Sequence, residues 1–209
     1  MDSAYFKTRY SPHPGRERVW KAICEYLQKF IPVSSTVADI GAGYGDFINQ
    51  IRATAKYAID TNSEAARCYA QDVQFVHASR IEDVDLSAKS IDVVMLSNLL
   101  EHLSPEQCTA LFDRIDNVLN AAGKVIVVQP NYIYCFRHYW DDFTHVRAFS
   151  HISLRDFLLS RGYKIIALER RFLPFSFKSR LPKSYFVTKL YLASFWRPLA
   201  AQMLVVAQR

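Results

Sequence analysis

The stretch that decides the fold is Val37-Ala38-Asp39-Ile40-Gly41-Ala42-Gly43-Tyr44-Gly45. The short apolar run over residues 36–40 predicts a strand, which leads directly into three glycines at alternate positions. Because glycine has no Cβ, such a turn can be tight and can let a ligand approach the backbone. We expect a helix to begin at once, with residues 47–51 in it, so that its N-terminal amides face that ligand.

Apolar runs alternate with helical patterns on both sides of this strand. The runs predict further strands at 56–60, 73–77, 91–96, 124–129, 163–169 and 202–207, and helices at 19–30, 63–70, 104–120 and 153–162. The helix after Ser104 has a capping serine, a proline in its first turn and Gln107 three residues on. The alternation predicts an α/β fold: a doubly wound, Rossmann-like, mostly parallel seven-stranded sheet with helices on both faces and an antiparallel last strand. Ligands of such sheets lie at the carboxyl ends of the strands.

The composition is that of one globular domain. The 209 residues are 50% hydrophobic and 22% charged, which excludes a disordered or low-complexity chain. We expect a single domain over 1–209, with an N-terminal helical segment 1–32, a lid-like insert 131–150 and a basic aromatic segment 171–200. No secretory signal or membrane span is visible, and the four cysteines form no CxxC pair. These features predict a cytoplasmic protein with ordinary thiols.

The net charge of +6 is unevenly distributed along the chain. Residues 37–130 hold seven Lys/Arg against thirteen Asp/Glu, whereas residues 131–209 hold thirteen against four. The basic C-terminal third indicates a phosphate-bearing partner or a membrane surface, or it is simply a solvated basic face. No run of five like charges occurs, which makes a nucleic-acid partner unlikely.

An acid closes the second strand, 21 positions after Asp39. A carboxylate at Asp60 can accept hydrogen bonds from both ribose hydroxyls of a nucleoside. A dinucleotide fingerprint would have its third glycine at position 46, which is Asp46, a poor neighbour for a pyrophosphate. The DxGxGxG pattern suits a nucleoside without a diphosphate, with a cationic centre that Asp39 helps to balance.

Four segments resemble the class I S-adenosylmethionine-dependent methyltransferases. They are VADIGAGYG (37–45), AID (58–60), IDVVMLSNLLEHL (91–103) and GKVIVVQPN (123–131). A closer likeness is to small bacterial methyltransferases that are encoded among glycosyltransferase and surface-polysaccharide genes. The segments SNLLEHL (97–103), PNYIYCFRHYWDDFTHVRAFSHISL (130–154) and RFLPFSFKSRLP (171–182) carry it.

The resemblance implies S-adenosyl-L-methionine as cofactor and a set of residues that bind it. These are Asp39, Gly41, Ala42, Gly43, Gly45, Asp60, Thr61, Asn62, Ala78, Ser79, Ser97 and Asn98. Many relatives place an acid against the adenine amine after the third strand, where this chain reads His77-Ala78-Ser79-Arg80. Either Ala78 and Ser79 cover the ring, or Glu82 or Asp83 reaches the amine.

A hydroxyl acceptor calls for a general base, and histidine is the usual choice. His102 follows the fourth strand and is one candidate, unless it caps or orients the next helix. Asp142 and His145 are a second candidate, because they form a base–orienter pair if their stretch is helical. His138, Asp142 and His145 are conceivable Mg²⁺ ligands, since some O-methyltransferases bind that ion, but we predict no metal site.

Aromatic residues crowd the insert 131–150. They stack on a sugar or planar acceptor, or they form a hydrophobic lid over the sheet. The predicted substrate-binding residues are Tyr132, Tyr134, His138 and Trp140.

The predicted function is O-methylation of a sugar or glycolipid acceptor in surface glycan biosynthesis. The alternatives are a methyltransferase of another small molecule, such as a quinone precursor or secondary metabolite, and a non-catalytic binding module. Segment 171–200 is predicted to contact the inner membrane face peripherally; a homodimer face or an amphipathic helix that seals the sheet edge are the other readings. Residues 5–18 are expected to fold over the bound cofactor.

Overall fold

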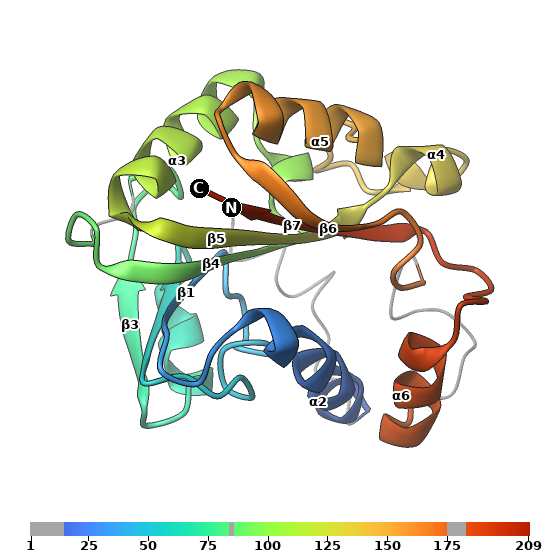
Figure 1. Cartoon of the computed structure of the whole chain (residues 1–209), viewed down its shortest axis with the longest axis horizontal. Coiled ribbons are helices and arrows are strands. Elements are labelled where there is room, and N and C mark those ends of the chain that lie inside the picture. Colours follow the sequence, from blue (N-terminus) through green and yellow to red (C-terminus); the bar gives the residue numbers. More distant parts are fainter. Residues whose placement is uncertain (1–14, 84–85, 175–182) are drawn as a thin grey trace.

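The computed structural model describes residues 15–83, 86–174 and 183–209. Its core is one sheet with the strand order β3-β2-β1-β4-β5-β7-β6 (Figure 1). The strands are β1 (Thr36–Ile40), β2 (Ala55–Asp60), β3 (Val73–His77), β4 (Ile91–Ser97), β5 (Leu119–Pro130), β6 (Lys164–Glu169) and β7 (Gln202–Gln208). The first five run parallel, and β7 is antiparallel to both β5 and β6. The predicted fold class is confirmed.

Helices cover both faces of the sheet. The helices α3 (Pro105–Val118) and α5 (His151–Ser160) lie on one face, and α2 (Arg16–Leu27) and α6 (Tyr185–Ala193) lie on the other (Figure 1). Strand residues alternate between two apolar cores: Val125 and Val127 pack with α3 and α5, whereas Ile126 and Val128 pack with α2 and α6. Both faces of the central strands are therefore apolar, as their uninterrupted β-branched runs require.

The strand order reverses between β1 and β4, because β2 and β3 extend the sheet on one side and β5 on the other. A crevice forms at such a reversal, outside the carboxyl ends of the strands. The loop after β1 and the residues after β4 stand on either side of it. Short 3-10 helices continue the chain after β2 (η2, Ser63–Cys68) and after β4 (η3, Leu100–His102).

Three local predictions were wrong. Residues 46–51 form turns instead of a helix: Asn49 and Ile51 make helix-like backbone bonds, but the pattern stops there. Helix α5 begins at His151, two residues before the predicted start at 153, because Ser150 is its cap and Ser153 completes the capping box from inside the helix. The helix after Ser104 ends at Val118, because the next residue already pairs with Ile91 in the sheet.

Some predictions fall on residues outside the described part. Most of segment 5–18 does, as do the basic and aromatic positions between 175 and 182. A 4-residue helix α4 (Tyr132–Cys135) and a 3-10 helix η4 (Tyr139–Asp141) occupy the insert 131–150. In the part of the chain that is described, no helix has the length and apolarity to cross a bilayer.

Phe112 on α3 offers a test of this packing. Its ring is fully buried and meets Phe157 edge-on at 4.9 Å and Tyr163 at 6.4 Å between centroids. We expect Phe112→Ala to lower the free energy of unfolding by about 3–5 kcal/mol, because a large cavity replaces the ring. The matched control is Phe195→Ala at a fully exposed phenylalanine, which should change it by no more than about 0.5 kcal/mol. Urea unfolding of both variants measures the difference, and equal losses would contradict the core assignment.

Candidate active site

A cavity of about 250 Å³ lies where the chain leaves β1, β2, β3 and β4. It is lined by Gly41, Gly43, Asp60, Thr61, Ser79, Arg80, Ile81, Glu82, Ser97, Asn98, Leu99, His102, Leu103 and Gln107. Asp60 and Ser97 are the last residues of β2 and β4, and every other lining residue comes from a segment that follows a strand. The cavity is therefore at the edge of the sheet that the strand order singled out.

The glycine-rich loop after β1 needs its glycines. Gly41, Gly43 and Gly45 have φ values of 77°, 54° and 78°, in the region that side chains with a Cβ rarely adopt. A Cβ on Gly45 would also lie 2.7 Å from Asn49 Nδ2 and 2.9 Å from Tyr69 Cδ1. The loop is thus shaped as a bare backbone wall for the cavity.

Asp60 fixes that wall to the end of β2. Its Oδ2 accepts a hydrogen bond from the Gly43 amide at 2.8 Å, and its Oδ1 accepts one from the Asn62 amide at 2.8 Å. A carboxylate has about four acceptor positions, so two remain for a ligand. Because Asp60 also lines the cavity, it fits the predicted contact with two ribose hydroxyls.

Two further carboxyl groups lie below the loop. Asp39 is 2% exposed, and its burial, with Asp60 and Asp46 nearby, raises its pKa well above the ordinary value. Burial also raises the pKa of Asp46, against the opposing effect of Arg16, whose guanidinium forms an ion pair with it. Neither residue lines the cavity. A cation bound above the loop would stabilise the ionised form of Asp39.

Of the two acids that the sequence offered for the adenine amine, Glu82 is the one that lines the cavity, and Ser79, from the other alternative, lines it too. The Glu82 side chain is buried and lines the cavity, and its Oε2 has no hydrogen-bond partner. Arg80 lies 3.7 Å from the other oxygen of Glu82, Oε1, and forms a closer ion pair, at 2.8 Å, with Asp83, which is 46% exposed. An orphaned carboxylate oxygen in the cavity wall fits an amine donor such as the exocyclic group of adenine. The residues present therefore fit S-adenosyl-L-methionine.

The predicted cofactor residues divide into two groups. Those that line the cavity are Gly41, Gly43, Asp60, Thr61, Ser79, Ser97 and Asn98; those that lie behind its lining are Asp39, Ala42, Gly45, Asn62 and Ala78. Sequence reasoning missed Arg80, Ile81, Leu99, Leu103 and Gln107 as lining residues. The positive φ of Asn98, 49°, turns the chain sharply after β4 and carries it along the cavity.

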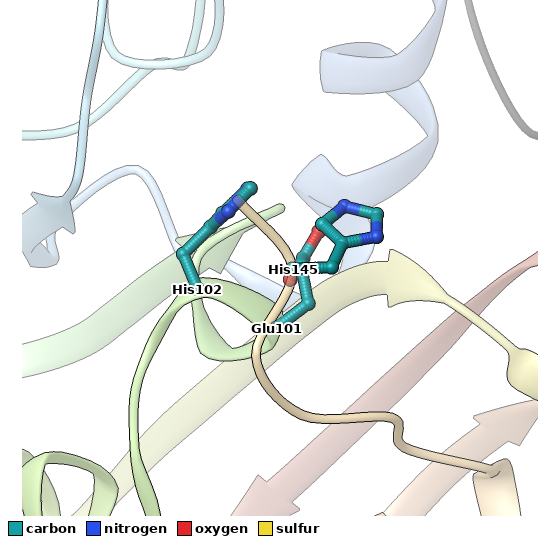
Figure 2. Close-up of side chains that lie close together, drawn as sticks. All are labelled: Glu101, His102 and His145. Carbon is teal, nitrogen blue, oxygen red and sulfur yellow. The ribbon is translucent and has the colours of Figure 1, made fainter. Parts of the chain in front are cut away.

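Glu101, His102 and His145 come together beside the cavity (Figure 2). The first two belong to η3, and His145 comes from the insert 131–150. The rings of His102 and His145 have centroids 5.0 Å apart. Val146 and Arg147 hold the insert here, since their amides donate to the Glu101 carbonyl at 2.9 and 3.2 Å. His102 does not cap α3, because Ser104 does.

Asp142 acts on this group through Thr144. The Thr144 hydroxyl donates to Asp142 Oδ1 at 2.7 Å and lies 3.1 Å from His102 Nδ1. Residues 142–145 form a turn, so the helical pairing predicted for Asp142 and His145 has no basis in the backbone. His138, a conceivable metal ligand with these two, points to Asp141 at 3.1 Å on the surface.

Burial shifts the proton affinities of the cluster. It raises the pKa of Glu101 to about 8, and Asp142 adds to this rise. It lowers the pKa of His102 to about 4, with His145 adding to the effect against the opposing Thr144 carbonyl. The His102 ring is therefore neutral near pH 7. A shift of this kind at a cavity wall is typical of a functional site.

None of the predicted substrate-binding residues lines the cavity. Tyr132 meets Tyr139 and Trp140 edge-on, at 5.2 and 6.5 Å between ring centroids. Tyr134 stacks on His151 at 6.4 Å, and His138 and Trp140 are exposed. Their role in binding an acceptor stays a prediction.

Comparison with known proteins places the chain in a family. Residues 14–168 match the family model described as "Methyltransferase domain". Because this match spans most of the sequence, the chain belongs to the methyltransferase domain family. A search of curated proteins found no match.

Many solved structures share the fold. A SAM-dependent methyltransferase from Archaeoglobus fulgidus is 20% identical, with 99% of this chain and 98% of that one covered and a TM-score of 0.64. A second, from Aquifex aeolicus, is 13% identical, with 100% and 98% covered and a TM-score of 0.64. The 1,6-didemethyltoxoflavin-N1-methyltransferase of Burkholderia thailandensis, solved with its acceptor and S-adenosylhomocysteine, is 18% identical, with 92% and 79% covered and a TM-score of 0.60. The predicted S-adenosylmethionine-dependent methyltransferase is thus confirmed at the level of family and fold.

Asp60→Ala should weaken the binding of S-adenosyl-L-methionine by about tenfold or more. Hydrogen bonds to a charged group contribute about 1.5–3 kcal/mol each, and the variant loses the acceptor of both ribose hydroxyls. Calorimetric titration measures the affinity. Asp72→Ala, which removes an exposed carboxylate that is paired with Lys56, is the control. Unchanged affinity in a folded Asp60→Ala variant would mean that the ribose lies elsewhere.

Binding of the cationic cofactor should release protons from Asp39. The pKa of this group is raised in the free protein and falls when a cation lies nearby, so the affinity should increase with pH across the range in which Asp39 ionises. Titrations in buffers of different ionisation enthalpy count the released protons. Asp39→Asn keeps the shape and removes the titration. If wild type and variant release equal numbers of protons, Asp39 is not the source.

Proposed function

We propose that this methyltransferase transfers the methyl group of S-adenosyl-L-methionine to a hydroxyl oxygen of a sugar or glycolipid acceptor in surface glycan biosynthesis. One observation carries the choice of oxygen: two imidazoles and a carboxylate meet beside the cofactor cavity. A hydroxyl must lose its proton as it is methylated, whereas a neutral amine already offers a lone pair. Such a cluster serves the first kind of acceptor.

The position of the cluster suits removal of a proton from an acceptor hydroxyl. His102 lines the cavity in company with Ser97 and Asn98, two of the residues that the family resemblance assigns to the cofactor. With a pKa near 4, His102 alone is a weak base. Activation of a hydroxyl therefore needs the neighbouring Glu101 and His145 as well, which is consistent with their placement.

Exposed aromatic side chains of the insert support a sugar acceptor. Phe136 and Trp140 are each 53% exposed and Phe143 is 79% exposed. Aromatic faces of this kind stack on the C–H surfaces of sugar rings. The chemistry of the cluster and this surface together suit a hydroxyl group on a sugar ring.

A second surface supports a lipid-linked acceptor. Phe186 and Leu190 on α6, and Phe195, Trp196 and Leu199 after it, are each at least 70% exposed. Lys183 precedes α6 and Lys189 lies on it, so apolar and cationic groups occur together. That combination suits contact with an anionic membrane, the predicted role of segment 171–200; a dimer face is the other reading.

Incubation with methyl-labelled S-adenosyl-L-methionine tests the proposal. Nucleotide sugars and polyprenyl-linked sugars form one set of acceptors, and catechols and amines form the comparison set. We expect label in a methyl ether of the first set, identified by mass spectrometry of the isolated product. Transfer to amines only would overturn it.

His102→Ala should reduce turnover by at least about a hundredfold, the low end of general base contributions, while the affinity for the cofactor stays within about twofold. His151→Ala is the control, since this histidine begins α5 and does not line the cavity. Single-turnover rates and calorimetry separate the two effects. Full activity of His102→Ala would remove the cluster from the reaction.

A further inference from the structure

We infer that Glu101, His102 and His145 are the protein ligands of a divalent transition-metal ion that holds the acceptor's hydroxyl oxygen. One ligand atom from each residue lies within 4.8 Å of the other two, and no other such group occurs among residues 15–83, 86–174 and 183–209. Zn²⁺ with two imidazoles and a carboxylate needs ligand atoms about 3.4 Å apart, so a small side-chain rotation closes the site. The metal site stands on this geometry, and only its role with an acceptor rests on the proposed function.

The two imidazoles are oriented as metal ligands usually are. His145 Nδ1 lies 2.7 Å from the Tyr139 carbonyl, and His102 Nδ1 lies 3.2 Å from the Thr144 carbonyl. A carbonyl oxygen carries no proton, so each Nδ1 must donate. The lone pair of each ring is then on Nε2. A backbone carbonyl that fixes the tautomer in this way is the common outer partner of a metal-bound histidine.

Thr144 strengthens that orientation for His102. Its hydroxyl donates its proton to Asp142 Oδ1, at 2.7 Å. Toward His102 Nδ1, at 3.1 Å, the hydroxyl oxygen can therefore act only as an acceptor. The Thr144 amide donates to the same Asp142 oxygen at 3.1 Å. Asp142 is thereby a positioning residue, which acts on His102 through Thr144.

Glu101 provides independent evidence for a cation at this position. The residue is 2% exposed, and its Oε2 has no hydrogen-bond partner in the described part of the chain. A buried carboxylate oxygen without a partner is destabilising, and native proteins rarely keep one without a reason. A cation coordinated by this carboxylate would remove the deficit. His102 and His145 are the nitrogen donors beside it (Figure 2).

The inferred ion defines the acceptor more closely. Three protein ligands leave coordination positions open, and two neighbouring oxygens of one molecule can fill them. Coordination lowers the pKa of a hydroxyl, which loses its proton to water. The oxygen then forms the bond to the methyl carbon, the C–S bond breaks, and its electron pair stays on the sulfur of S-adenosylhomocysteine. Vicinal diols of sugar rings are the acceptor class that this arrangement fits.

The first test measures metal binding alone, on the full chain without a histidine tag after treatment with EDTA. We expect Zn²⁺ to bind in a one-to-one ratio by calorimetry, and Co²⁺ to give the visible absorption of a site with nitrogen ligands. Glu101→Gln and His145→Ala should each weaken Zn²⁺ binding by at least about tenfold. Thermal unfolding shows whether each variant is folded.

His138→Ala is the matched control, because His138 and Asp141 form an exposed histidine–carboxylate pair at 3.1 Å. It should leave the Zn²⁺ affinity unchanged. A wild-type protein that binds no Zn²⁺ or Co²⁺, or whose binding is lost with His138→Ala and not with Glu101→Gln, overturns the metal site, whatever its methyltransferase activity.

A second test addresses the acceptor. Restoring Zn²⁺, Co²⁺ or Mn²⁺ to the EDTA-treated protein should raise methylation of sugars with adjacent free hydroxyls by at least about tenfold, and should do little for the same sugars with one hydroxyl blocked. Stoichiometric metal binding with no methylation of either sugar would refute the proposed function and leave the metal site supported. Equal methylation with and without metal would overturn the ion's role in catalysis.

Discussion

The hydrogen bond from the Gly43 amide to the Asp60 carboxylate is the constraint on which the site depends. It joins the loop after β1 to the end of β2 across the floor of the cavity, at 2.8 Å and out of contact with solvent. A glycine loop with three positive φ values has no preference of its own for one shape. Asp60 supplies that preference before any ligand arrives, and the residue also lines the cavity. One side chain thus shapes the cavity and is also the predicted ligand of the cofactor's ribose.

Four buried carboxyl groups surround the cavity, and burial makes the ionisation of a carboxyl group costly. Asp39, Asp60, Glu82 and Glu101 are all buried, and each lines the cavity or lies next to it. Burial raises the pKa of Asp39 and of Glu101, which means that the empty site opposes their ionisation. A cofactor with a sulfonium and an ammonium group relieves part of this cost, and a metal ion at Glu101 would relieve another part.

The sequence predicted the strands well because each central strand is a short, β-branched run that is buried on both faces. It predicted helices less well where a tertiary contact decides whether a helix forms or where it begins. Residues 47–51 have a helical pattern, yet they stop after one turn, because Asn49 turns to the chain near Cys68 and its side chain bonds there. Ser150 and Ser153 both suit a helix start, and only the backbone shows which one is the cap. For segment 171–200 the sequence offered an amphipathic helix only as one alternative, so the bounds of α6 were not predicted.

The same division holds for the site. The glycines, Asp60, Ser97 and Asn98 follow strands directly, so a linear motif locates them. His145 is 44 positions from Glu101, and no spacing rule connects the two. They meet because the Val146 and Arg147 amides bond to the Glu101 carbonyl, which draws the insert against η3. The cofactor half of the site is therefore encoded locally along β1, β2 and β4, whereas the reactive cluster exists only when the insert is docked. An acceptor that displaced the insert would dismantle the cluster, so the proposed function requires the acceptor to enter beside residues 131–150 and not beneath them.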